Sequence, residues 1–262
     1  MNAIEKLKTA IQKNKSMLCV GLDPDPGLMP KGLSIFEFNK DIIDATADLV
    51  CAFKPNLAFY EVQGASGIGM LEQTIEHIPE HIPVILDAKH NDIGNTARFY
   101  AKAVFETLGV DAVTVNPYLG YDGIEPFLSY KDKLTFVLCL TSNKSAREFE
   151  HWGKEPLFKH IASKCAEWNV NGNCGLVAGA THPEELKEIR GIAKELPLLV
   201  PGIGKQGGDL ETSVKIAASG GSIAVFNASR SVIHASNKAN FAESARKEAL
   251  ELKNIILDTA GF

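Results

Sequence analysis

The sequence predicts an α/β fold, a (β/α)8 TIM barrel, and three observations lead to this prediction. Eight short apolar runs are typical of buried parallel strands, and segments with helical spacing lie between them. The units recur about every 30 residues, so the 262-residue chain has the length of one such barrel. Polar residues follow the apolar runs at several strand ends, where this fold carries its active sites. A doubly wound open sheet is the main alternative.

The elements follow one another without a linker, repeat or low-complexity stretch, so a single barrel domain over residues 1–262 is expected. An amphipathic helix over about residues 1–15 precedes the barrel, and a closing helix over about 237–258 ends it. The predicted strands are 17–22, 50–54, 84–88, 112–115, 135–140, 175–178, 198–200 and 223–226. Helical spacing is clearest over 35–50, 93–108, 156–168, 183–196 and 210–218.

Composition excludes some classes of function. The formal net charge of −5 provides no general basic field for nucleic acid, so an anionic ligand needs a local cluster of positive groups. Four of the five cysteines, Cys19, Cys51, Cys139 and Cys174, lie in apolar runs, which favours buried, reduced thiols over disulfides. No signal peptide and no membrane-spanning length is evident, so we expect a cytoplasmic protein without a membrane partner.

The most informative segment is 83–96, in which an apolar strand runs into Asp87, Lys89 and Asp92. Side chains alternate along a strand, so Asp87 and Lys89 are expected on one face. Charges at a strand end are costly to desolvate unless they compensate one another or perform chemistry. Two structural alternatives remain: an ion pair in the barrel mouth, and Asp92 as the cap of a helix beginning near Ile93.

Other predicted strands also end in polar residues, as an active site at the C-terminal barrel face requires. The first strand ends in Asp23 and the second in Lys54 and Asn56. The fifth is followed by 141–143 and the eighth by 227–230.

The glycine-rich stretch 201–208 after the seventh strand has two interpretations. Gly202, Gly204 and Gly207 match the G-x-G-x-x-G dinucleotide motif, but the next strand ends without the acidic residue which that motif requires. A barrel phosphate site fits better, with Gln206 and Arg230 as donors to the phosphate. A plain glycine-rich turn beside a surface arginine is the structural alternative.

Four motifs together resemble one family. Gly-Leu-Asp at 21–23, Lys-Pro-Asn at 54–56, Asp-Ala-Lys-x-x-Asp-Ile-Gly-x-Thr at 87–96 and Pro-Gly-Ile-Gly-x-Gln-Gly-Gly at 201–208 resemble orotidine 5′-phosphate decarboxylases of the longer bacterial type. The resemblance covers about residues 17–235. His90 and Asn91 depart from the Arg-Gly that such relatives more often carry.

This resemblance implies chemical roles for five residues in the formation of uridine 5′-phosphate. Asp87 would lie against the departing carboxylate, and Lys89 would stabilise the C6 carbanion and then protonate it. Lys54 and Asp92 would complete an alternating chain of charges. Asp92 and Thr96 would come from the partner subunit of a homodimer with shared active sites.

The resemblance also implies residues that bind the substrate. Asp23 would contact the ribose, Asn56 would lie near the sugar or the charges, and Ser142 would contact the base, although its neighbours in 141–143 remain alternatives. The expected phosphate-binding residues are Pro201, Gly202, Gln206, Ser229 and Arg230.

We expect neither a metal nor a cofactor, because the seven histidines show no metal-ligand spacing and no cofactor motif is present. Instead, a fixed lysine ammonium can stabilise the negative charge that develops on the reacting carbon. Three rival functions use the same pattern. They are a Mg²⁺-dependent sugar-phosphate decarboxylase or synthase, a Schiff-base aldolase acting through Lys89, and a phosphosugar-binding module.

Overall fold

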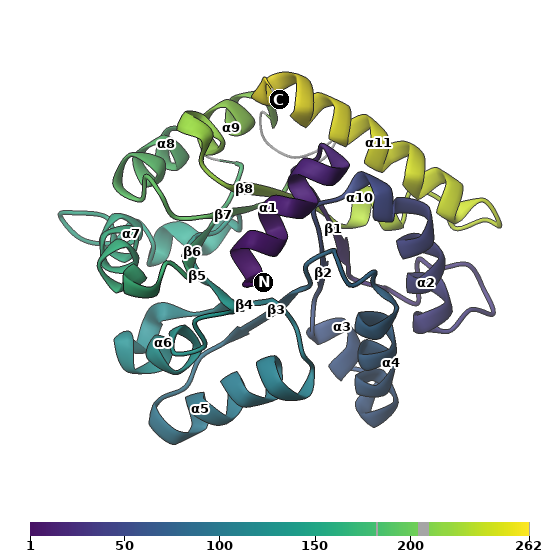
Figure 1. Ribbon diagram of the computed structural model, residues 1–262, viewed down its shortest axis with the longest axis horizontal. Coiled ribbons are helices and arrows are strands. Elements are labelled where there is room, and N and C mark those ends of the chain that lie inside the picture. The colour runs from purple at the N-terminus through teal and green to yellow at the C-terminus, as the bar shows by residue number, and fades with distance from the viewer. Residues whose placement is uncertain (182, 204–209, 262) are drawn as a thin grey trace.

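Eight parallel strands form a barrel in the computed structural model, which describes residues 1–181, 183–203 and 210–261 (Figure 1). Their order is β2-β1-β8-β7-β6-β5-β4-β3. Bridges between Phe53 and Val84 and between Asn56 and Asp87 join β2 to β3 and close the ring. This closure confirms the predicted barrel and rules out the open sheet. The strands are β1 (Leu18–Leu22), β2 (Ala52–Pro55), β3 (Ile85–His90), β4 (Ala112–Val115), β5 (Leu134–Leu140), β6 (Cys174–Ala178), β7 (Leu198–Pro201) and β8 (Ala224–Ala228).

Helices surround this barrel (Figure 1). Those following β1 to β4 are α2 (Ile35–Thr46), α3 (Ala58–Glu61), α4 (Gly64–His77), α5 (Gly94–Lys102) and α6 (Tyr121–Leu128). Those following β5 to β8 are α7 (Leu157–Trp168), α8 (Pro183–Ile192), α9 (Leu210–Ala217), α10 (Arg230–Ile233) and α11 (Phe241–Ala260).

Three of the predicted helices end earlier than their hydrophobic spacing indicates. The first passes into a 3-10 turn at Ala47–Leu49, and the second into a π-helical segment at Ala103–Thr107. The helix predicted over 183–196 ends at Ile192. Just beyond it, the Arg190 guanidinium donates hydrogen bonds to the carbonyls of Ala193 and Leu196, so a side chain caps this helix end.

Helix α1 (Ala3–Asn14) lies across the N-terminal mouth of the barrel (Figure 1). Asn2 and Glu5 form a capping box at its start. Lys6 pairs with Asp111 at 2.8 Å, just before β4, and the Asn14 amide donates to the carbonyl of Val50, just before β2. Helix α1 is thus fixed to the N-terminal end of the barrel by contacts near β2 and β4.

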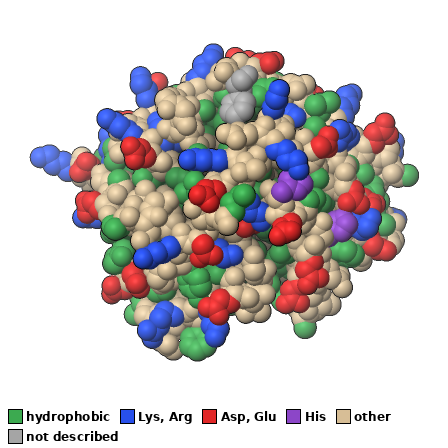
Figure 2. Space-filling view, in the orientation of Figure 1, with side chains coloured by type: hydrophobic (Ala, Val, Ile, Leu, Met, Phe, Trp, Pro, Cys, Tyr) green, Lys and Arg blue, Asp and Glu red, His purple; other side chains and the backbone are tan. Residues whose placement is uncertain are grey.

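All five cysteines are buried and unpaired, as predicted for four of them. Burial raises the pKa of the Cys19 thiol to about 12, so this thiol is protonated at neutral pH. Within the described ranges, no helix is long and apolar enough to cross a bilayer. Acidic and basic side chains are interspersed on the face seen in Figure 2, in keeping with the absence of a general basic field.

Candidate active site

Asp87 of β3 joins two lysines at the C-terminal end of the barrel. Its Oδ2 accepts a hydrogen bond from Lys54 Nζ of β2 at 2.8 Å, and its Oδ1 accepts one from Lys89 Nζ at 2.5 Å. The Lys54 side chain is 4% exposed, that of Asp87 12% and that of Lys89 47%. We call these three residues the charged array.

Asp87 and Lys54 of the array are charged at neutral pH. Burial would raise the pKa of Asp87, but the charges and hydrogen bonds of Lys54 and Lys89 hold that pKa well below its usual range. Burial would likewise lower the pKa of Lys54, yet the charges of Asp23 and Asp87 raise it. The site therefore keeps buried charges in place because each compensates another.

The depressed pKa of Asp87 predicts a pH-dependent contribution to stability. Asp87→Asn should lower the free energy of unfolding by about 3 kcal/mol at pH 7, because Lys54 loses its buried partner. A carboxylate with a depressed folded-state pKa stabilises the fold above its unfolded-state pKa, and this stabilisation fades as the pH falls toward the folded-state value. The difference in free energy of unfolding between Asp87→Asn and wild type should therefore become progressively smaller below about pH 4.

Urea unfolding at pH 7 and at pH 3 measures this difference. Asp44→Asn is the matched control, because Asp44 contacts Lys40 and His77 on the surface and its side chain is 52% exposed. These surface contacts should each contribute less than about 1 kcal/mol. An Asp87→Asn variant as stable as wild type at both pH values would contradict the proposed electrostatic role.

Lys89 occupies an irregular position in β3. The pairing of β3 with β4 is interrupted between Leu86 and His90, and Lys89 has φ +50°, in the left-handed region. Such a conformation costs a residue with a side chain roughly 1–2 kcal/mol. The sequence interpretation, in which regular strand alternation places Asp87 and Lys89 on one face, therefore does not hold at Lys89. The Lys89 ammonium nevertheless donates a hydrogen bond to Asp87. Backbone strain of this kind is a feature of functional sites.

A pocket of about 860 Å³ opens beside the array, at the C-terminal ends of the strands. Its lining includes eight of the residues singled out from sequence, which are Asp23, Lys54, Asp87, Ser142, Pro201, Gly202, Ser229 and Arg230. Gln206, together with Gly204 and Gly207, lies outside the described residues. The pocket that contains Lys54 and Asp87 of the charged array thus lies at the end of the barrel that the strand-end pattern predicts for the active site.

Three buried polar atoms of residues lining this pocket have no hydrogen-bond partner among the described residues. They are Asp23 Oδ1, Thr181 Oγ1 and Asn227 Oδ1. Buried polar groups are normally paired, so these atoms mark a place for a polar ligand. Thr181 was not singled out from sequence, and Asn227 was noted only as a strand end.

Two glycines lie at strand ends beside the pocket, and one of them is required by a close approach. A side chain at Gly21 of β1 would collide with Ser229, so only glycine lets these segments approach. Gly202 has φ +86°, and a Cβ there would lie 3.8 Å from Ser142 Oγ. The end of β7 thus lies near the end of β5, across the pocket.

Other predicted residues lie around the array rather than in it. Asn56 pairs with Asp87 in the β2–β3 bridge, and its side chain accepts a hydrogen bond from the Ala58 N–H. The Asp92 side chain accepts a hydrogen bond from the N–H of its neighbour Ile93. Ile93, not Asp92, is the N-cap residue of α5, and no side chain forms a capping hydrogen bond at this helix start. The alternative that Asp92 caps this helix is therefore wrong. Thr96 is exposed on α5.

Sequence reasoning missed a buried hydroxyl that contacts the array. Thr114 of β4 donates to Asp87 Oδ1 at 2.9 Å and accepts from the Lys89 N–H at 3.0 Å. The only signal in the sequence is one polar residue within the apolar run Ala-Val-Thr-Val.

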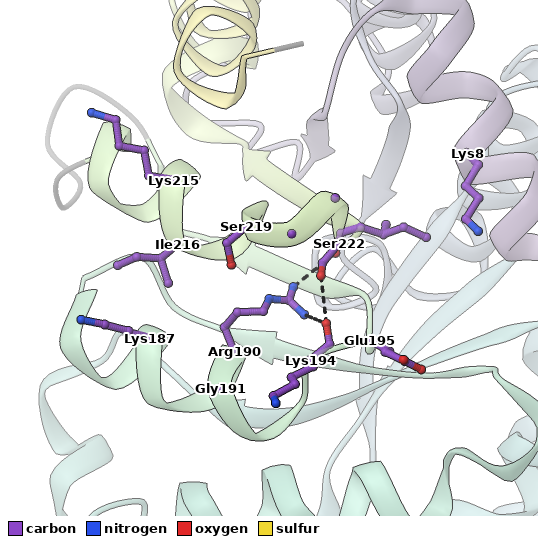
Figure 3. Close-up of a pocket in the computed structure, with 13 residues that line it drawn as sticks. Lys8, Lys187, Arg190, Gly191, Lys194, Glu195, Lys215, Ile216, Ser219 and Ser222 are labelled. Carbon is purple, nitrogen blue, oxygen red and sulfur yellow. Dashed lines mark hydrogen bonds between the residues drawn. The ribbon is translucent and has the colours of Figure 1, made fainter.

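A second pocket, of about 820 Å³, lies at the N-terminal end and includes Lys8 of α1 and Arg190 of α8 (Figure 3). The Arg190 guanidinium bonds backbone carbonyls, including that of Ile223 just before β8. Figure 3 shows the side chains of Lys187 and Lys215 extending away from Arg190. We interpret this pocket as structural, as is usual for this face of the barrel.

Comparison with known proteins gives consistent results. The family model "Orotidine 5′-phosphate decarboxylase / HUMPS family" matches residues 16–245. The orotidine 5′-phosphate decarboxylase of Herpetosiphon aurantiacus is 51% identical over 255 residues, which cover 94% of each chain. That of Dehalococcoides mccartyi is 49% identical and covers 98% of this chain and 97% of its own.

Solved structures agree. The OMP decarboxylase of Leishmania donovani has a TM-score of 0.85 at 37% identity, covering 98% of this chain and 99% of its own. The UMP synthase of the same organism has a TM-score of 0.87 at 39% identity, and the match covers 98% of this chain but 57% of that one.

Proposed function

The chain belongs to the orotidine 5′-phosphate decarboxylase / HUMPS family, and from this premise we propose that it converts orotidine 5′-phosphate to uridine 5′-phosphate and CO2. The observation that carries the proposal is the charged array beside the pocket. It holds an ammonium at a partly exposed position and fixes it against a carboxylate. Such a preorganised cation stabilises negative charge without having to reorganise during the reaction.

In the proposed reaction, the bond between C6 and the substrate carboxylate breaks, CO2 leaves, and the electron pair stays on C6. The Lys89 ammonium stabilises this carbanion and then transfers a proton from Nζ to C6. Solvent reprotonates the amine, which its 47% exposure permits. Asp87 holds Lys89 in place and lies against the substrate carboxylate, so their repulsion falls as CO2 departs.

Lys54 favours this reaction over the metal-dependent alternative. It is buried, and its positive charge is held against Asp87. A Mg²⁺ ion bound to Asp87 would stand next to this ammonium and be repelled by it. The Schiff-base alternative needs a neutral Lys89 amine, whereas Lys89 is ion-paired.

We assign the other residues singled out from sequence to three parts of the proposed substrate. We assign Asp23 to the ribose, with Asn56 near it, and Ser142 to the base. We assign the 5′-phosphate to Pro201 and Gly202 at the end of β7, to Ser229 and Arg230 just after β8, and to Gln206, which lies outside the described residues. Binding energy from this distant group can orient the base and so raise kcat.

The proposed assembly is a homodimer in which Asp92 and Thr96 complete the partner's site. Exposed apolar side chains beside these residues in the chain support it, because a monomer gains nothing from exposing them. Ile93 is 55% exposed and Phe99 65%. The five free, buried thiols are in keeping with the reducing cytoplasm.

The proposal predicts that purified protein treated with EDTA consumes orotidine 5′-phosphate and forms uridine 5′-phosphate. Absorbance of the orotate ring reports the loss of substrate, and chromatography identifies the product. Incubation with a sugar phosphate and borohydride is the control, which should trap no covalent adduct. If the substrate is stable under these conditions, or if turnover needs added Mg²⁺, the proposal is wrong.

A further inference from the structure

Thr114 contacts the backbone of Lys89, the residue on which the proposed reaction depends, and also the carboxylate that holds the Lys89 ammonium. Its side chain is buried, with 1% of the residue exposed. The hydroxyl accepts a hydrogen bond from the Lys89 backbone N–H, and this leaves its single proton for Asp87 Oδ1. The same Oδ1 accepts the hydrogen bond of the Lys89 ammonium. One hydroxyl therefore contacts both the backbone of Lys89 and the carboxylate that holds its Nζ.

The backbone contact replaces a missing strand bond. The ladder between β3 and β4 is interrupted between Leu86 and His90, so Lys89 is not paired with a β4 residue in register. A backbone N–H that loses its ladder partner needs another acceptor. Thr114 supplies it from its side chain and thereby supports the left-handed conformation of Lys89, at φ +50°.

The carboxylate contact restrains Asp87. Lys54 occupies Oδ2, while Lys89 and Thr114 share Oδ1. Both lysines end in rotatable groups on long stems, whereas Thr114 is anchored in a strand whose neighbour Val113 pairs with Leu86. The hydroxyl is thus a neutral contact on a short, strand-anchored side chain, and it restricts the rotation of the carboxylate.

We infer that Thr114 is a positioning residue that sets the place of the Lys89 ammonium, an inference that rests on the proposed function. Thr114 is not among the residues that line the pocket. It acts on the reaction through Lys89 and Asp87, with which it forms hydrogen bonds. Its removal should therefore change the rate of the chemical step more than substrate binding.

The test compares Thr114→Val, which has nearly the same shape but lacks the hydroxyl, with Thr114→Ser, which keeps it. We expect Thr114→Val to lower kcat on the order of 100-fold, the effect of a displacement of about 1 Å at a reacting group, with little change in KM. Thr114→Ser should keep most of the wild-type kcat.

Thr135→Val is the matched control. Thr135 is also a fully buried threonine on this barrel, but its hydroxyl has no partner among the described residues and lies at the N-terminal end of β5. This control should leave kcat and KM unchanged. Melting temperatures of all variants separate a loss of stability from a loss of rate.

A Thr114→Val enzyme with wild-type kcat would overturn the inference, as would a Thr114→Ser enzyme as impaired as Thr114→Val. If Thr114→Val does not fold, Thr114→Ala against Thr114→Ser makes the same comparison. A wild-type protein without activity on orotidine 5′-phosphate would overturn the proposed function and the inference with it, whereas an active wild type with equally active variants overturns the inference alone.

Discussion

Replacing Lys89 with alanine is expected to lower kcat on the order of 10⁵-fold. Lys89 has two roles in the proposed reaction, because it stabilises the charge that develops at C6 and then supplies the proton. Loss of one preorganised donor costs about 10²–10³-fold, and loss of a general acid about 10²–10⁴-fold. The expected change is largely in kcat, because the phosphate end of the pocket is left intact. Steady-state kinetics with orotidine 5′-phosphate measure it.

Lys40→Ala is the matched control for this variant. The Lys40 side chain is 44% exposed and pairs with Asp44, much as the 47% exposed Lys89 pairs with Asp87, but it lies on α2 outside the pocket. Its removal should leave the kinetics unchanged. A Lys89→Ala enzyme that retains substantial turnover would argue for a binding module or for a different catalytic group.

Mixing Lys89→Ala with Asp92→Ala is expected to restore activity that neither variant has alone. If each site takes Lys89 from one subunit and Asp92 from the other, a hybrid dimer contains one intact site and one doubly defective site. Equal mixing with free exchange produces hybrids as half of all dimers, so about a quarter of the wild-type activity should return. Activity after mixing and subunit exchange measures this recovery.

Two controls make the result decisive. A tag on one variant establishes by affinity capture that hybrids have formed. Lys89→Ala mixed with Asp87→Ala should stay inactive, because both residues belong to the same strand and the same site. Proven hybrids without recovered activity would mean that Asp92 does not act across the interface.

The barrel and most of the array could be predicted from sequence, because their signals are local in the chain. Apolar runs at regular spacing predict the strands. The segment 83–96 places Asp87, Lys89 and Asp92 within six positions of one another. Helix α4 is not among the helices predicted from hydrophobic spacing, and Gly64, Gly67 and Gly69 disfavour a helix there. Gly67 is required because it packs against the carbonyl of Tyr60 without room for a side chain.

The contacts within the site could not be predicted in this way. Lys54 meets Asp87 across 33 positions of sequence, and Thr114 meets it across 27. These contacts with Asp87 depend on the register between neighbouring strands of the barrel. The strand pattern also implies regular alternation, whereas a local irregularity in β3 gives Lys89 its left-handed backbone.

The amino-acid sequence was sufficient to predict the kind of fold, the end of the barrel that carries the polar residues, and the residue types available for chemistry. These features follow from periodicity and residue order, which are properties of the chain. The packing of the folded chain, in contrast, brings two lysines and a threonine onto Asp87. It also leaves buried polar atoms of the pocket-lining residues Asp23, Thr181 and Asn227 without a hydrogen-bond partner among the described residues. Hydrogen bonds depend on distances of a few tenths of an ångström, and those distances are set by how distant strands pack against one another.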